Sequence, residues 1–261
     1  MNEPVLLNVS PQGVATVTLN RPELHNALDD KTVDLLQATL ATLAEDNSVR
    51  VVILTGAGIS FSAGHDGDWL KRMADFSPEQ IERDARRLSG LLQTLDRLPH
   101  PTIARVQGSA FGIGAGLIAC CDVAIAVSEA LFAFSDVKLG VIPAISAPYV
   151  IRAIGERATR RYFVTAERLN AGKAKRLGLI HQTVENDELD DAVAHMARSL
   201  LLNGPQAMTA AKQLVQAIGQ QPIGEKVIEQ SIATIVALRS SEEGREGVNA
   251  FLEMRKPGWV R

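Results

Sequence analysis

Two glycine-rich turns place small residues where backbone N–H groups can reach a ligand. The first, residues 61–67, reads Phe-Ser-Ala-Gly-His-Asp-Gly, and the second, residues 108–116, reads Gly-Ser-Ala-Phe-Gly-Ile-Gly-Ala-Gly. Each follows a predicted strand, and a helix that starts at such a turn directs its N–H donors outward. Two turns of this kind on neighbouring strands predict an oxyanion hole, in which one donor typically lowers a barrier by roughly 2.7–4 kcal/mol.

Other motif-based chemistries fit the chain poorly. The second turn contains Gly112 and Gly114, but the third glycine of a dinucleotide fingerprint would fall at Leu117. Neither a Walker A pattern nor a Gly-x-Ser-x-Gly nucleophile elbow occurs. The five histidines are scattered and the two cysteines, Cys120 and Cys121, are adjacent, which gives no zinc-binding spacing. We therefore expect no metal and no separate cofactor.

Strand and helix patterns alternate through the first two thirds of the chain. A turn at residues 11–13 predicts a hairpin between residues 5–7 and the alternating segment 14–19. Further apolar runs predict buried strands, and apolar residues at steps of three and four predict helices between them. The predicted strands are 51–54, 102–106 and 122–127, and the predicted helices lie within 29–43 and 77–95. Strands that alternate with helices indicate a parallel α/β core.

The character of the chain changes from about Asn186, where helical patterns such as Ile228, Ile232 and Ile235 dominate. We predict a core over residues 1–195 and a helical region over residues 196–261, which packs on the core or on another subunit. No repeat of fixed period and no Gly-, Ser- or Pro-rich linker separates two independent domains.

Composition bounds the class of protein. The chain has 261 residues, of which 46% are hydrophobic and 22% charged, as in soluble globular proteins. Two adjacent cysteines exclude a disulfide framework and favour a reducing compartment. The N-terminus lacks signal-peptide features, and the most apolar stretch, residues 108–121, is shorter than the about 20 residues of a membrane span. A net charge of −3 argues against a nucleic-acid partner. We expect a cytoplasmic protein with neither a membrane nor a nucleic acid as partner.

Five ordered motifs resemble the enoyl-CoA hydratase/isomerase (crotonase) family over nearly the whole chain. They are residues 18–28, 61–66, 108–122, 134–143 and 250–257. The resemblance implies an α/β spiral of ββα units with a helical C-terminal trimerisation region, assembled as a homotrimer or a dimer of trimers. It also implies an acyl-CoA thioester substrate, so that coenzyme A arrives as part of the substrate.

The resemblance assigns roles to residues of both turns. It implies that the thioester oxygen accepts hydrogen bonds from the backbone N–H groups of His65 and Ile113, and that the His65 side chain is incidental. It implies that Asp136 is the catalytic acid/base. The residues expected to contact substrate or CoA are Ala63, Gly64, Asp66, Gly112, Gly116 and Lys256.

One departure from the family matters for the reaction. Family hydratases carry two carboxylates, and at the first position this chain has Gly116, while Asp136 replaces the common Glu at the second. A single carboxylate can take a proton from water and return it to carbon in a syn addition, which defines a hydratase. It can also shuttle a proton as in a Δ3,Δ2-enoyl-CoA isomerase. A weakly catalytic acyl-CoA binder and an RNA binder are further alternatives.

A more detailed resemblance suggests which acyl group the substrate carries. Gly116, residues 120–122 and residues 142–163 together resemble bacterial 3-methylglutaconyl-CoA hydratases of leucine catabolism and the related isohexenylglutaconyl-CoA hydratases. We therefore expect a branched or glutaconyl-type 2-enoyl-CoA. The second carboxylate of such a substrate needs a cation near the far end of the acyl group. The candidates are Lys138, Arg152 and Arg72.

Overall fold

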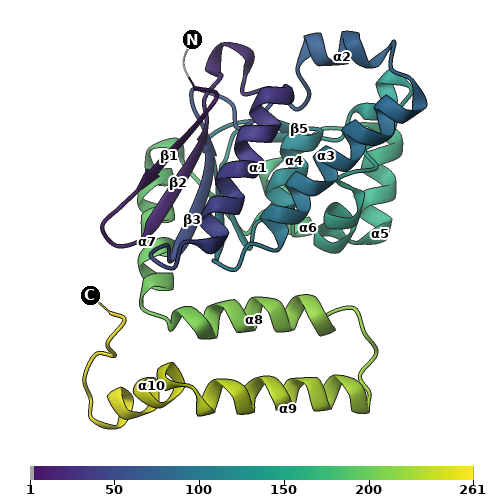
Figure 1. Ribbon diagram of the computed structural model, residues 1–261. Coiled ribbons are helices and arrows are strands. Elements are labelled where there is room, and N and C mark those ends of the chain that lie inside the picture. The colour runs from purple at the N-terminus through teal and green to yellow at the C-terminus, as the bar shows by residue number, and fades with distance from the viewer. Residues whose placement is uncertain (1–2, 261) are drawn as a thin grey trace.

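A computed structural model describes residues 3–260 and shows a mixed six-stranded sheet with helices on it (Figure 1). The strand order is β1-β2-β3-β4-β6-β9. β1 and β2 are antiparallel, and each later neighbour is parallel to the one before it. The strands are β1 (Val5–Val9), β2 (Val14–Leu19), β3 (Val51–Gly56), β4 (Thr102–Val106), β6 (Val123–Val127) and β9 (Gln182–Val184). The predicted α/β class, the hairpin and the three buried strands are confirmed.

A second, small sheet was not predicted from the sequence. It contains β5 (Ala110–Phe111), β7 (Leu131–Ala133) and β8 (Leu169–Asn170), in that order. These strands are only two or three residues long, too short to show a periodic pattern. β5 lies inside the second glycine-rich turn, and its pairing with β7 brings the segment that carries Asp136 beside that turn.

The helices of the core begin where the sequence supplies caps. Ser77 accepts a hydrogen bond from the N–H of Gln80, whose side chain accepts one from the N–H of Ser77, which forms a capping box. Asp29 caps α1 by accepting from Thr32. The core helices are α1 (Asp30–Glu45), α2 (Gly67–Met73), α3 (Pro78–Asp96), α4 (Ile113–Cys120), α5 (Ala147–Thr165), α6 (Ala171–Leu177) and α7 (Leu189–Leu201), and three 3-10 turns occur at η1 (Pro22–Leu24), η2 (Asp136–Leu139) and η3 (Asn186–Glu188).

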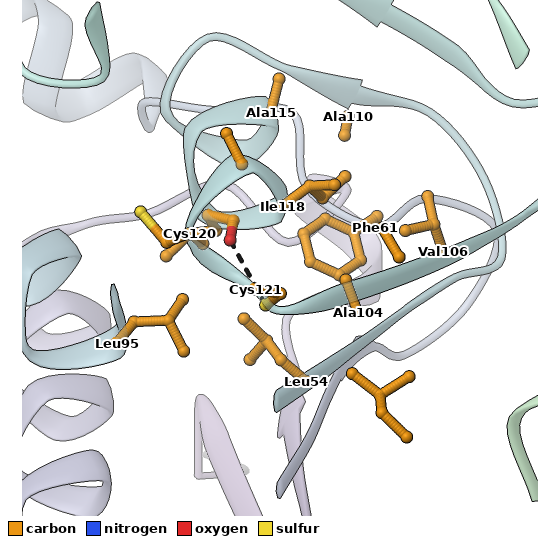
Figure 2. Packing of buried hydrophobic residues seen from close by; sticks show 14 of the residues in the cluster. Leu54, Phe61, Leu95, Ala104, Val106, Ala110, Ala115, Ile118, Cys120 and Cys121 are labelled. Atoms are coloured by element: carbon orange, nitrogen blue, oxygen red, sulfur yellow. Dashed lines mark hydrogen bonds between the residues drawn. The ribbon is translucent and has the colours of Figure 1, made fainter. Parts of the chain in front are cut away.

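Every residue of α4 is buried, and this burial fixes the second turn in place. Figure 2 shows Ala115 and Ile118 of α4 near Phe61 of the first turn and near strand residues such as Ala104 and Val106. Phe61 itself is fully buried. Because protein interiors are close-packed, both turns are held rigidly by the same hydrophobic core.

Helices α8 (Pro205–Ile218), α9 (Glu225–Ser240) and α10 (Glu242–Leu252) form a layer below the core (Figure 1). The boundary predicted at residue 195 falls inside α7. This helix still belongs to the core, since Leu189, Val193 and Ala197 bury one of its faces against the sheet. The separate layer therefore begins at Pro205. No helix within residues 3–260 has both the length and the apolar character needed to cross a bilayer.

Candidate active site

A cavity of about 300 Å³ lies between the two turns, α2, α3 and the segment that follows β7. Most of its lining is apolar, from residues such as Met73, Phe76 and Leu88. The polar side chains of the lining are His65, Asp84, Ser135 and Asp136, and Trp69 adds an indole N–H. An apolar cavity with a few convergent polar groups is typical of a small-molecule site.

The two turns are joined directly. The N–H of Phe111 donates to the carbonyl of Ser62 at 2.9 Å, and the N–H of Phe61 donates to the carbonyl of Ser109 at 3.0 Å. Gly64 has a φ of +92°, and a Cβ there would lie 2.8 Å from the carbonyl oxygen of Phe111. Only glycine allows this approach, so the first turn needs Gly64 for both its conformation and its packing.

The His65 N–H is positioned by the strand-like pairing of the first turn with Leu28. The Leu28 N–H donates to the carbonyl of Gly64 at 2.7 Å, and the Asp66 N–H donates to the carbonyl of Leu28 at 3.0 Å. Successive N–H groups of an extended chain point to opposite sides. The His65 N–H is therefore directed away from Leu28, and His65 lines the cavity.

The Ile113 N–H belongs to the first turn of α4, where N–H groups have no acceptor within the helix. The preceding residue, Gly112, has φ +52° and ψ −123° and donates its own N–H to the carbonyl of Ala133 at 2.8 Å. Gly112 lines the cavity, whereas the buried Ile113 side chain points into the core cluster. Of the two predicted oxyanion donors, His65 lines the cavity, and Ile113 directly follows the lining residue Gly112.

Asp136 lies at the start of η2 and faces the second turn. Its Oδ2 atom is buried and makes no hydrogen bond within the described chain. A Cβ on Gly112 would lie 3.9 Å from this oxygen. Buried polar atoms are normally hydrogen-bonded, and an unpaired one inside a cavity is suited to a substrate or a water molecule. The structure therefore brings Asp136 to the same cavity as both turns.

Three other side chains of the cavity form a connected group that was not predicted. The His65 ring stacks on Trp69 with centroids 4.1 Å apart and planes at 14°. Trp69 Nε1 donates to Asp84 Oδ1 at 3.2 Å. Burial lowers the pKa of His65, against the opposing effect of the Asp136 and Asp84 charges. Asp84 shares a helix face with Ile81, Ala85 and Leu88, a spacing that could have placed it in the cavity.

Asp66 lies beside the cavity lining and organises the first turn. Its Oδ1 accepts from the N–H of Asp68 at 2.8 Å and caps α2. Its Oδ2 forms an ion pair with Arg21 at 3.0 Å, and both side chains are largely buried. The Asp66 carboxylate therefore holds the turn that contains His65 against the segment that follows β2.

Gly116 lies outside the cavity lining, packed against Ser146. A Cβ at Gly116 would lie 2.7 Å from the Cβ of Ser146, a distance that real Cβ atoms essentially never show. The carboxylate that family hydratases carry at this position would therefore require Ser146 or α4 to move. Ser146 is buried and precedes α5, so a side chain at position 116 would press on the segment that follows Asp136.

The remaining predicted residues divide between the cavity and the surface. Ala63 and Gly64 line the cavity, while Lys256 is exposed in the C-terminal segment. The cations expected to meet a second substrate carboxylate lie elsewhere. Lys138 is exposed, Arg152 pairs with Asp96, and Arg72 pairs with Asp30. Within the part of the chain that the structure describes, the cavity lining contains no Lys or Arg. Nor do residues 3–260 contain a cluster of His, Cys, Asp and Glu suited to a metal ion.

The fold places the two glycine-rich turns and the carboxylate of Asp136 around one cavity. The chain matches the enoyl-CoA hydratase/isomerase family over residues 10–261 and therefore belongs to that family. A putative enoyl-CoA hydratase of Thermus thermophilus is 32% identical, with 97% of this chain and 99% of that protein covered. A short-chain-enoyl-CoA hydratase of Clostridium acetobutylicum is also 32% identical, covering 93% of this chain and 92% of the relative.

Solved structures agree with this assignment. An enoyl-CoA hydratase from Shewanella pealeana is 41% identical and superimposes with a TM-score of 0.95, over 98% of this chain and 96% of that chain. The predicted crotonase-type fold is thereby confirmed, and an acyl-CoA thioester substrate is consistent with the family.

Proposed function

We propose that this protein is an enoyl-CoA hydratase that adds water to a 2-enoyl-CoA thioester with Asp136 as its acid/base. The observation that carries the proposal is the buried Asp136 Oδ2, which has no hydrogen-bond partner within the described chain and faces the second turn. The names of the similar proteins, which include several hydratases, support the same reaction.

The proposed reaction uses the two turns and one carboxylate. The thioester oxygen accepts hydrogen bonds from the N–H groups of His65 and Ile113. Asp136 takes a proton from water while the water oxygen bonds to Cβ, and the double-bond electrons move toward the thioester oxygen. The two N–H donors stabilise the resulting enolate. Asp136 then returns the proton to Cα, and because one carboxylate serves both steps, water adds to one face of the double bond.

A Δ3,Δ2-enoyl-CoA isomerase is the second candidate, and the packing at Gly116 favours it. Without room for a carboxylate on α4, Asp136 alone would shuttle a proton between Cα and Cγ. The two reactions share the oxyanion hole and differ in whether water is bound at Cβ. A protein that binds acyl-CoA and turns it over weakly is the third outcome.

The glutaconyl-type acyl group suggested by the sequence carries a second carboxylate. Since no Lys or Arg lies among the described lining residues, the proposal covers 2-enoyl-CoA thioesters as a class. We also propose a homo-oligomer, as a trimer or a dimer of trimers. The half-exposed side chains of Ile228, Ile232 and Ile235 on α9 give the C-terminal layer an apolar face suited to another copy of the chain.

Purified protein is mixed with crotonyl-CoA and, separately, with 3-methylglutaconyl-CoA, and product mass and thioester absorbance are followed. A mass gain of one water with the wild type is expected. Asp136→Asn should reduce the rate by about 10²–10⁴-fold, the usual contribution of an acid/base group. The matched control, Asp68→Asn, changes an exposed carboxylate on α2 and should leave the rate unchanged. Double-bond migration without water addition would establish the isomerase instead.

A further inference from the structure

Hydration by one carboxylate is assisted when a second polar group holds the water against Cβ. In this chain the packing of Gly116 on Ser146 leaves α4 unable to supply that group without rearrangement. The titratable side chains that line the cavity are His65, Asp84 and Asp136. Besides Asp136, the titratable groups of this lining that could hold the water are therefore His65 and Asp84.

One carboxylate oxygen of Asp84 is already engaged. Its Oδ1 accepts the indole N–H of Trp69 at 3.2 Å, and this hydrogen bond fixes the indole over the cavity. The His65 ring lies on that indole in a nearly parallel stack. The Asp84 carboxylate thus orients Trp69, and Trp69 orients the imidazole. The stacking holds the His65 ring in one position and leaves its two nitrogen atoms free to bind other groups.

The nitrogen atoms of His65 make no hydrogen bond within the described chain, and Trp69 contacts the ring only through its face. Burial lowers the pKa of His65 below its ordinary value of 6.5. The charged groups that face the ring are Asp136 from η2 and Asp84 from α3, and both oppose this shift without reversing it. Burial therefore favours the uncharged imidazole, in which one nitrogen can accept a hydrogen bond.

We propose that the His65 imidazole holds the attacking water in the hydration that Asp136 drives. This inference rests on the proposed hydratase function. One O–H of the water donates to the free nitrogen of His65, and the other proton passes to Asp136 as the oxygen bonds to Cβ. The bond to His65 is kept by the new hydroxyl group, and Asp136 returns its proton to Cα. No further reactant is required, and His65 has a side-chain role in addition to its backbone N–H.

The test separates water addition from proton transfer at Cα. His65→Ala removes the imidazole but keeps the backbone N–H of the oxyanion hole, and His65→Gln keeps an acceptor of similar reach. Two rates are measured on each variant: hydration of crotonyl-CoA, and exchange of the α-proton of butyryl-CoA with D2O, which needs only Asp136 and the oxyanion hole.

We expect His65→Ala to lower hydration about 100-fold, as for loss of one acid/base-type contact, and to leave exchange within about three-fold. His65→Gln should recover part of the hydration rate. Asp136→Asn should lose both reactions, and Asp68→Asn should lose neither. In the wild type, hydration should fall on acidification as His65 gains a proton, and the part of the pH dependence that comes from His65 should be absent from His65→Gln.

Three outcomes overturn the inference. Unchanged hydration in His65→Ala would show that the imidazole does not hold the water. Equal loss of hydration and exchange would show that the ring only maintains the structure of the turn, a result that a matching loss of thermal stability would confirm. A wild type that exchanges the α-proton but hydrates no enoyl-CoA would contradict the proposed function as well, whereas the first two outcomes leave that function standing.

Discussion

The two glycine-rich turns resemble each other in sequence but serve the cavity in different ways. The first turn, residues 61–67, presents a side chain, because His65 is stacked on Trp69 at the cavity wall. The second, residues 108–116, presents backbone alone. A Cβ at Gly114 would lie 2.8 Å from Ser62, and one at Gly116 would lie 2.7 Å from Ser146.

This difference shows why glycine is needed at each place. In the second turn, the glycines allow α4 to approach its neighbours closely and set the direction of the Ile113 N–H. In the first turn, Gly64 is needed for its positive φ and its close approach to Phe111, while a Cβ added at Gly67 would have no neighbour within 4 Å. Turns of similar composition therefore use glycine differently: the second packs α4 closely at Gly114 and Gly116, whereas the first has open space at Gly67.

The largest effect is expected from Gly112→Ala. Gly112 combines φ +52° with ψ −123°, which L-residues rarely adopt, so alanine should turn the Ile113 N–H away from the thioester oxygen. Loss of one oxyanion donor should lower kcat by about 10²–10³-fold. Steady-state hydration of crotonyl-CoA measures this loss. The control is Gly67→Ala in the first turn, which should keep full activity. Equal effects of the two substitutions would remove the distinction between the turns.

A smaller effect, on stability, is expected from Gly116→Ala. Its Cβ would collide with Ser146, and overpacking of this kind should lower the free energy of unfolding by about 1–3 kcal/mol. Urea denaturation measures the change. The double variant Gly116→Ala with Ser146→Gly should recover most of it, since the colliding atom is gone. A single variant as stable as the wild type would show that α4 has more room than its contacts indicate.

The smallest effect is expected from the cap of α2. Asp66→Ala removes the acceptor for the N–H of Asp68 and should lower the free energy of unfolding by about 0.5–2 kcal/mol. Asp66→Asn keeps a capping oxygen but loses the ion pair with Arg21, so it should lie between alanine and wild type. Thermal unfolding ranks the three proteins. If asparagine destabilised as much as alanine, the ion pair rather than the cap would anchor the first turn.

Local patterns predicted much of this arrangement. The hairpin, the buried strands and the helix within residues 77–95 are set by neighbouring residues, and the structure contains all of them. The motif spacing also led to the cavity, which Ala63, Gly64, His65, Gly112 and Asp136 line.

What the sequence did not reveal depends on contacts between distant segments. Trp69 of α2 donates a hydrogen bond to Asp84 of α3. Gly116 packs against Ser146, which follows Asp136 in the chain. Helical periodicity alone does not distinguish a helix packed on the sheet, such as α7, from one that leaves it. Charge alone does not show which cations are free for a second carboxylate: Arg152 pairs with Asp96 and Arg72 pairs with Asp30.

The most direct test of the account is a crystal structure of Asp136→Asn bound to crotonyl-CoA. The thioester oxygen should lie about 2.7–3.1 Å from both the His65 and the Ile113 backbone nitrogens, as an oxyanion hole requires. The amide side chain that replaces the carboxylate should face the double bond. A thioester oxygen bound elsewhere, or contacted by only one of the two turns, would contradict the claim that the turns act together.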